Sequence, residues 1–160
     1  MPRLRSAALL LAAAALAGCD AFSPGPDSLT EARALWAETG RADYVVEQRY
    51  AFVCHVCDGG GDALDFATVT VRDGKVVEVV DGEGALIFAA EALPQTYEQI
   101  ALTVEEAFAL IEQVERYPEA YPGRFVVAYD PELGYPTRIE IGDDDAEAYS
   151  RARLRGLRLL

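Results

Sequence analysis

The chain of 160 residues is poor in the side chains that enzymes use as nucleophiles and bases. Its single histidine is His55 and its single lysine is Lys75. Its four serines are Ser6, Ser23, Ser28 and Ser150. A Ser-His-Asp triad needs a rigidly held serine beside a histidine, and no serine falls in a segment expected to form the core. Phosphate-binding loops, dinucleotide-binding glycine patterns and paired-histidine zinc motifs are also lacking. We therefore predict that the protein is not an enzyme and holds no metal or cofactor.

Positive charge is scarce as well. The chain has 14 Lys and Arg against 27 Asp and Glu, a formal net charge of −13. Arg3 and Arg5 lie in a segment that we expect to be removed, which leaves 12 − 27 = −15 on the mature chain. A field of this sign repels phosphate backbones, so nucleic acid is excluded as a partner.

The apolar run from Ala7 to Ala17 is too short to cross a bilayer, which takes about 20 residues. Because it follows two arginines, it is typical of a signal-peptide core. The Leu-Ala-Gly-Cys segment that ends at Cys19 resembles the lipobox of bacterial lipoproteins. That resemblance implies that residues 1–18 are cleaved as a signal peptide and that Cys19 is lipidated. The alternative is a plain secretory signal with an incidental cysteine.

These features predict an exported cell-envelope protein held to a membrane by an N-terminal lipid anchor. Two or three acyl chains would make this anchor permanent in practice, since each buried methylene contributes about 0.8 kcal/mol. Residues 19–28, rich in Pro, Gly and Ser, form a flexible tether. A single domain follows over residues 29–145, and residues 146–160 form a basic, leucine-containing tail. This tail could touch anionic lipid headgroups, dock on its own domain or fray.

The domain shows two helix signals and several strand signals. Capping boxes begin helices at Ser28 and Thr103, the second helix ending near Tyr117. Asp73-Gly74 between two β-branched runs indicates a hairpin. Leu86 to Ala92 is ambiguous between strand and helix. The expected strands are 43–54, 66–72, 75–80, 124–129 and 135–141. The predicted fold class is α+β, an antiparallel sheet of about five strands with two helices packed on one face.

Three segments together are similar to a known bacterial family. They are Tyr129 to Ile139, with its Tyr-Asp-Pro-x-x-Gly-Tyr-Pro pattern, the helix start at 103–108, and the hairpin at 69–77. They resemble the domain-of-unknown-function family 6174 over about residues 29–142. The resemblance implies an envelope or secreted domain with no assigned activity, and it transfers no catalytic residues.

Cys54 and Cys57 form the one concentrated chemical feature, a Cys-His-Val-Cys segment. In an oxidising compartment the pair is expected to form a short structural disulfide at the end of a strand. A dithiol redox centre is an alternative, although no helix begins at Cys54 to lower its thiol pKa. A second alternative is that the two cysteines form half of a metal site, but zinc would need further ligands.

Tyr129 and Tyr135 on the last predicted hairpin are candidates for a recognition surface. With catalysis disfavoured, the sequence predicts a non-catalytic binding module. Its partner would be another envelope protein or a cell-wall component. The alternative function is a small thiol-redox or metal-handling protein that uses Cys54 and Cys57.

Overall fold

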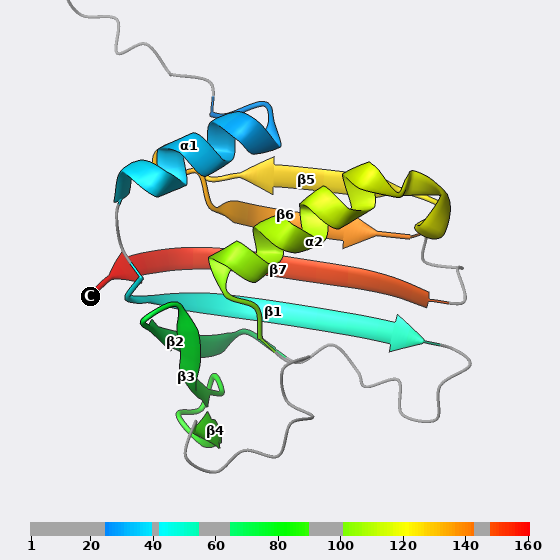
Figure 1. Cartoon of the computed structure of the whole chain (residues 1–160). Coiled ribbons are helices and arrows are strands. Elements are labelled where there is room, and N and C mark those ends of the chain that lie inside the picture. Colours follow the sequence, from blue (N-terminus) through cyan, green and yellow to red (C-terminus); the bar gives the residue numbers. More distant parts are fainter. Residues whose placement is uncertain (1–24, 40–41, 55–64, 90–100, 143–147) are drawn as a thin grey trace, which may run out of the picture.

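The computed structural model describes residues 25–39, 42–54, 65–89, 101–142 and 148–160. Its helices and strands follow one another as α1 (Leu29–Thr39), β1 (Tyr44–Cys54), β2 (Ala67–Arg72), β3 (Lys75–Val80), β4 (Leu86–Ala89), α2 (Val104–Arg116), a 3₁₀ turn (Pro118–Ala120), β5 (Phe125–Tyr129), β6 (Pro136–Ile141) and β7 (Ala148–Leu159). The strands form one antiparallel sheet in the order β4-β3-β2-β1-β7-β6-β5 (Figure 1). Two meanders therefore meet where the first strand pairs with the last.

The predicted α+β class is confirmed, but the sheet has seven strands among the described residues, not five. The ambiguous segment that begins at Leu86 forms β4, an edge strand of four residues. The prediction of a separate tail over residues 146–160 is wrong, because residues 148–159 form β7 inside the sheet. The predicted domain boundary at residue 145 is therefore wrong too.

Strand β7 pairs with β1 from Tyr44–Leu159 to Cys54–Ala148, the longest ladder in the sheet. This segment forms a strand because buried and exposed side chains alternate along it. Ala152 and Leu154 are buried, while Arg153 and Arg155 between and after them are exposed. A period of two is the pattern of a strand with one face on the core.

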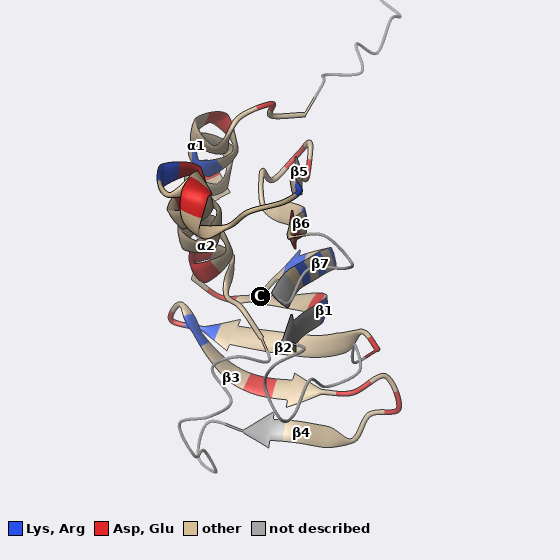
Figure 2. Ribbon diagram, turned by 90° about the vertical axis from the view of Figure 1, so that its right-hand side faces the viewer, with Lys and Arg blue, Asp and Glu red and all other residues tan. Residues whose placement is uncertain are grey.

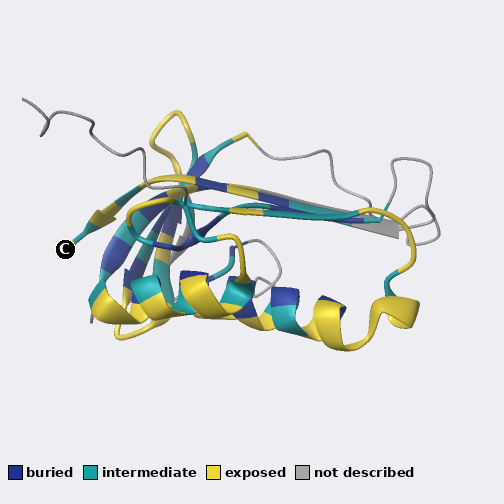
Figure 3. Ribbon diagram, turned by 90° about the horizontal axis from the view of Figure 1, so that it is seen from above, coloured by how far each residue is buried: buried dark blue, intermediate teal, exposed yellow. Residues whose placement is uncertain are grey.

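The core lies between the sheet and the two helices, which both cover the same face (Figures 2 and 3). Along the helices, buried residues lie on the side toward the sheet and exposed residues on the side away from it. From α1 come Ala32 and Trp36, and from α2 come Phe108 and Ile111. The helices leave the opposite face of β5, β6, β7 and β1 uncovered (Figure 2).

Both helices begin where the sequence predicts. The Glu31 amide donates to the Ser28 hydroxyl at 3.3 Å, although the Glu31 carboxylate accepts from the amide of Asp27 instead of that of Ser28. At α2 the box is complete, since Thr103 and Glu106 each accept from the other's backbone amide. These contacts satisfy amides that a helix N-terminus leaves without partners.

Two buried side chains of β1 fix the start of α2. The Tyr44 hydroxyl accepts from the Val104 amide at 2.7 Å. The Gln48 side chain accepts from the Leu102 amide at 2.8 Å and donates to the Leu102 carbonyl at 3.3 Å. Burial is the main cause that raises the pKa of Tyr44, so the phenol stays neutral and keeps its proton. Polar groups on the core face of β1 therefore position α2 across the sheet.

The β5–β6 turn packs against α1 and requires glycine at one position. Gly134 has φ of +76°, and a Cβ there would lie 2.3 Å from the Ala32 carbonyl oxygen. The Asp130 carboxylate accepts from the amides of Glu132 and Leu133 at 3.0 and 2.8 Å. The Tyr-Asp-Pro-x-x-Gly-Tyr-Pro segment thus forms a turn that joins the sheet to α1.

Replacing Tyr44 by Phe should destabilise the fold without creating a cavity, because the buried Val104 amide would lose its acceptor. We expect a loss of about 1–3 kcal/mol in the free energy of unfolding, measured by urea denaturation. Tyr117→Phe is the matched control, since Tyr117 is 48% exposed, and should change stability by less than about 0.5 kcal/mol. Equal stability of Y44F and Y117F would contradict the role assigned to the Tyr44 hydroxyl.

Candidate functional site: an arginine face

The uncovered face of the sheet is rich in arginine. Residues that pair directly across strands point to the same face, so the registers place these side chains together. On β5, β6, β7 and β1, with the residue that precedes β5, the described charged residues of this face are Arg124, Arg138, Glu140, Arg151, Arg153, Arg155, Arg158, Glu47 and Arg49. We call this set the arginine face. Seven arginines and two glutamates give it a formal charge of +5, although the whole chain carries −13.

A bulge in β7 adds the last arginine to this set. Val45 pairs with Arg158 and Glu47 pairs with Arg155, so β7 has one more residue than β1 between these pairs. Gly156, with φ of +61°, lies in the extra segment. Strict alternation would send Arg158 to the core face, but a bulge of one residue returns it to the arginine face.

Three arginines lie directly opposite one another across three strands. Arg49 of β1 pairs with Arg153 of β7, and Arg153 pairs with Arg138 of β6. Their Cα atoms are about 5 Å apart across each pair, as in any antiparallel ladder. Like charges in this arrangement destabilise a sheet unless a counter-charge is supplied.

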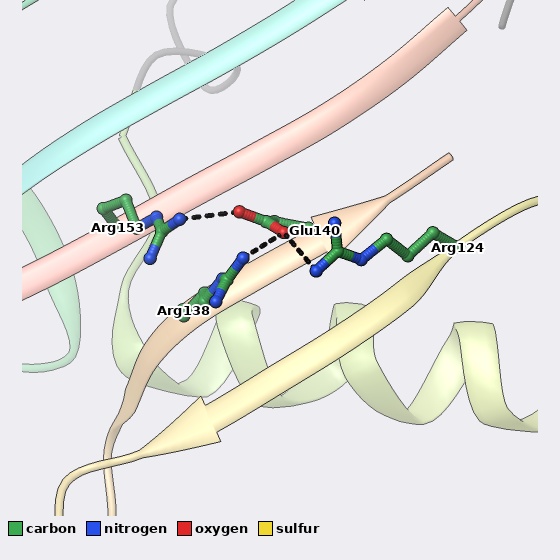
Figure 4. Close-up of polar contacts among 4 residues, drawn as sticks. All are labelled: Arg124, Arg138, Glu140 and Arg153. Carbon is green, nitrogen blue, oxygen red and sulfur yellow. Dashed lines mark hydrogen bonds and ion pairs between the residues drawn. The ribbon is translucent and has the colours of Figure 1, made fainter. Parts of the chain in front are cut away.

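Glu140 supplies that counter-charge (Figure 4). Its carboxylate accepts hydrogen bonds from Arg138 and Arg153, each at 2.6 Å, and lies 3.9 Å from a guanidinium nitrogen of Arg124. The Glu140 side chain is only 8% exposed, whereas those of Arg153 and Arg124 are 44% and 59% exposed. The arginines therefore cover the carboxylate and still present charge to solvent.

The hydrogen bond from Arg138 is the main cause that lowers the pKa of Glu140, and the charges of Arg138, Arg153 and Arg124 add to it. Burial acts in the opposite direction but does not prevail. The same hydrogen bond raises the pKa of Arg138. Glu140 is therefore ionised at neutral pH, and it holds two guanidinium groups in place.

The β1 side of the face has a different arrangement. Arg155 donates to Glu47 at 2.7 Å and lies 3.8 Å from the centre of the Phe66 ring, a cation–π contact. Arg49 is exposed, and within the described part of the chain it makes no ion pair. The face thus combines guanidinium groups that are paired with glutamates and the exposed guanidinium group of Arg49.

Chemically, such a face recognises anions. Guanidinium groups present several donors in a fixed planar fork, which matches phosphate and carboxylate oxygens. The outer side of α2 carries the opposite charge, including Glu105, Glu112 and Glu115. Figure 2 shows basic residues on β7 and both acidic and basic residues on the helices. In α2 the acidic ones prevail, with four glutamates against one arginine. The domain is therefore electrically two-sided, and an anionic partner is attracted to the sheet side.

The residues predicted from sequence lie elsewhere. Cys19 and Cys57 fall outside the described residues, and Cys54 is the last residue of β1. Tyr135 is 4% exposed and packs in the core, which contradicts its predicted place on a recognition surface. Tyr129 is partly buried against the same core, and burial raises its pKa to about 12. The reason is that both side chains point toward the helices rather than away from them.

The described residues hold no helix long and apolar enough to cross a membrane. Nor do three His, Cys, Asp or Glu side chains come together in that part of the chain as metal ligands would.

Sequence reasoning missed the arginine face because it treated β7 as a tail. The signal was available in the Arg-Ala-Arg-Leu-Arg run over residues 151–155, which alternates with period two. One of the two partners of this strand, however, is β1, which lies about a hundred residues earlier, and no local pattern reveals that pairing.

Comparison with known proteins gives one match. A family model described as a family of unknown function (DUF6174) matches residues 28–149. The match ends within β7, before the four arginines of that strand. No curated protein and no solved structure matches the chain.

Replacing Glu140 by Gln should lower the free energy of unfolding by about 1.5–3 kcal/mol at pH 7, because one acceptor oxygen becomes an NH₂ donor facing a guanidinium group and the negative charge is lost. Since folding lowers the pKa of Glu140, its contribution is present above the unfolded value of about 4.3 and disappears as pH falls through the folded value. Urea denaturation between pH 7 and pH 3 should show the difference between wild type and E140Q shrinking in the acid range.

The control for this experiment is Glu47→Gln, which removes an exposed ion pair with Arg155. Such pairs contribute little, so E47Q should stay within about 1 kcal/mol of wild type at every pH. A constant difference between E140Q and wild type down to pH 3 would show that Glu140 does not act through its ionised form.

Proposed function

Because the chain belongs to this family of unknown function, DUF6174, whose description assigns no activity, we propose a function from its own residues. The protein is a lipid-anchored component of the cell envelope, and it acts as a non-catalytic binding module. Its binding surface is the arginine face, and its partner is an anionic component of the envelope. The observation that carries this proposal is a face of charge +5 on a chain of charge −13.

The cost of building this face supports a binding role. An uninterrupted row of arginines gains nothing for the sheet by itself, since like charges oppose one another. The Arg138 Nε–H is also buried without an acceptor in the described part of the chain. Unsatisfied donors and repelling charges reduce stability, and functional sites are among the places where proteins keep such features.

The position of the tether supports anchoring close to the domain. Gly25 lies against the β5–β6 turn, since a Cβ at this residue would be 3.0 Å from the Cα of Pro131. From Cys19 to Gly25 the chain can extend at most about 20 Å. A lipid on Cys19 would therefore hold the β5 side of the sheet near a membrane surface.

The anchor is tested by palmitate labelling in cells, followed by separation of membranes. Wild type and Cys54→Ala should incorporate label and sediment with membranes. Cys19→Ala should do neither, because two or three acyl chains supply the anchoring free energy. Label that persists in C19A would contradict lipidation at this residue.

The binding surface is tested by photo-cross-linking in cells. Ala128 pairs with Arg138 and is exposed on the arginine face, whereas Ala109 is exposed on α2. A photoreactive residue at position 128 should form an adduct with an envelope component, and one at position 109 should not. The yield of the adduct at position 128 should fall as the salt concentration during irradiation rises. Equal adducts at both positions, or none at position 128, would contradict the proposed surface.

A further inference from the structure

We propose that the partner of the arginine face is the layer of phosphate headgroups of the membrane that holds the lipid anchor. The domain would lie with its sheet on that membrane and its helices away from it. This proposal rests on the proposed function, because it takes lipidation at Cys19 and the use of the arginine face as given. It adds the identity of the partner and the orientation of the domain.

The shape of the charge distribution favours an extended anionic surface. The arginines come from three adjacent strands and from the residue before β5, so their charge covers several strand spacings of about 4.8 Å each. Arg49, Arg153 and Arg138 form a row across the strands, and Arg158 extends the charge along β7. Headgroup phosphates in a bilayer form a similar two-dimensional array, which one carboxylate or one free phosphate does not.

The negative charge of the rest of the domain does not prevent this contact. A helix with its side chains is about 10–12 Å across, and α2 packs on the far side of the sheet. The outer carboxylates of α2, such as Glu115, are therefore farther from the arginine face than the Debye length of about 8 Å at physiological ionic strength. At contact the membrane interacts mainly with the arginines, and the acidic helices favour the orientation in which they point away.

The anchor explains why this membrane is favoured over a partner in solution. Each basic residue close to an anionic leaflet strengthens association by about fivefold, which is weak for a free protein of net charge −13. A tether of about 20 Å keeps the domain at a high effective concentration beside the surface. The β5 side lies next to the tether through Gly25 and Pro131, and β6, β7 and β1 follow within about 15 Å.

The side chains of this surface that the structure describes are not those of an inserting one. The large apolar side chains exposed among the described residues are Leu86, Tyr117 and Leu160. None of these three lies on β5, β6, β7 or β1. As far as the described side chains show, the contact is therefore electrostatic, with guanidinium groups at the level of the phosphates.

The test uses the lipidated full-length product, purified from membranes and reconstituted into vesicles. One set of vesicles contains phosphatidylcholine alone, and the other also contains phosphatidylglycerol. An arginine-specific dicarbonyl reagent modifies exposed guanidinium groups, and mass spectrometry gives the rate at each residue. Arg49 and Arg153 report on the arginine face, and Arg116, whose side chain is 60% exposed on α2, is the internal control.

We expect several-fold slower modification of Arg49 and Arg153 in the anionic vesicles, with no change at Arg116. Raising the salt to about 1 M, where the Debye length is about 3 Å, should abolish the difference. In phosphatidylcholine vesicles with added inorganic phosphate the rates should stay high. Protection by inorganic phosphate alone would identify a free-anion site and overturn the membrane proposal.

A charge-matched pair of variants gives a second readout. Arg49→Gln/Arg158→Gln removes two arginines of the face, and Arg33→Gln/Arg116→Gln removes two from the helix side. The first should weaken association of the face with the anionic leaflet by up to about 25-fold and so remove most of the protection of Arg153, and the second should leave that protection unchanged. Equal effects would mean that only net charge matters, which contradicts a specific face.

The outcomes separate the two proposals. If the protein does not remain with either kind of vesicle, the lipid anchor is absent and the proposed function fails. If it remains anchored but Arg49 and Arg153 are modified at equal rates in both, the membrane is not the partner. In that case an adduct with a protein at position 128 in cells would leave the binding module in place and identify its partner as protein.

Discussion

The arginine face depends on one buried carboxylate. Glu140 accepts hydrogen bonds from Arg138 and Arg153 and lies near Arg124, so a single carboxylate is the counter-charge of three guanidinium groups. Without it, the middle of the sheet would oppose arginine to arginine across β6, β7 and β1. This carboxylate therefore links β6 to β7, the strand through which one meander meets the other, and it organises the surface that we propose to be functional.

Much of the fold could be predicted from local patterns. The Ser28 hydroxyl caps the start of α1 and a capping box fixes the start of α2, and Asp73-Gly74 has positive φ at both residues, as a type I′ hairpin requires. The turn at Asp130 to Gly134 follows from its own residues as well. In each case the determining contacts lie within a few residues, which a sequence pattern can capture.

The site could not be predicted in the same way. Its charge is assembled from strands far apart in the chain, and its last member depends on a bulge at Gly156. Tyr135 illustrates the opposite error, because an aromatic residue beside a turn suggested an exposed surface, yet the turn docks on α1 and buries it. Which face a side chain occupies is decided by tertiary pairing, and composition carries little of that information.

Because Glu140 holds guanidinium groups in place, the face is organised before any partner arrives. Nuclear magnetic resonance of arginine side chains tests this directly, through the exchange of guanidinium protons with water at pH 7. We expect slow exchange and restricted motion at Arg138 and Arg153, and fast exchange at Arg49, which has no ion pair in the described part of the chain. Equally fast exchange and free motion at all three arginines would contradict it.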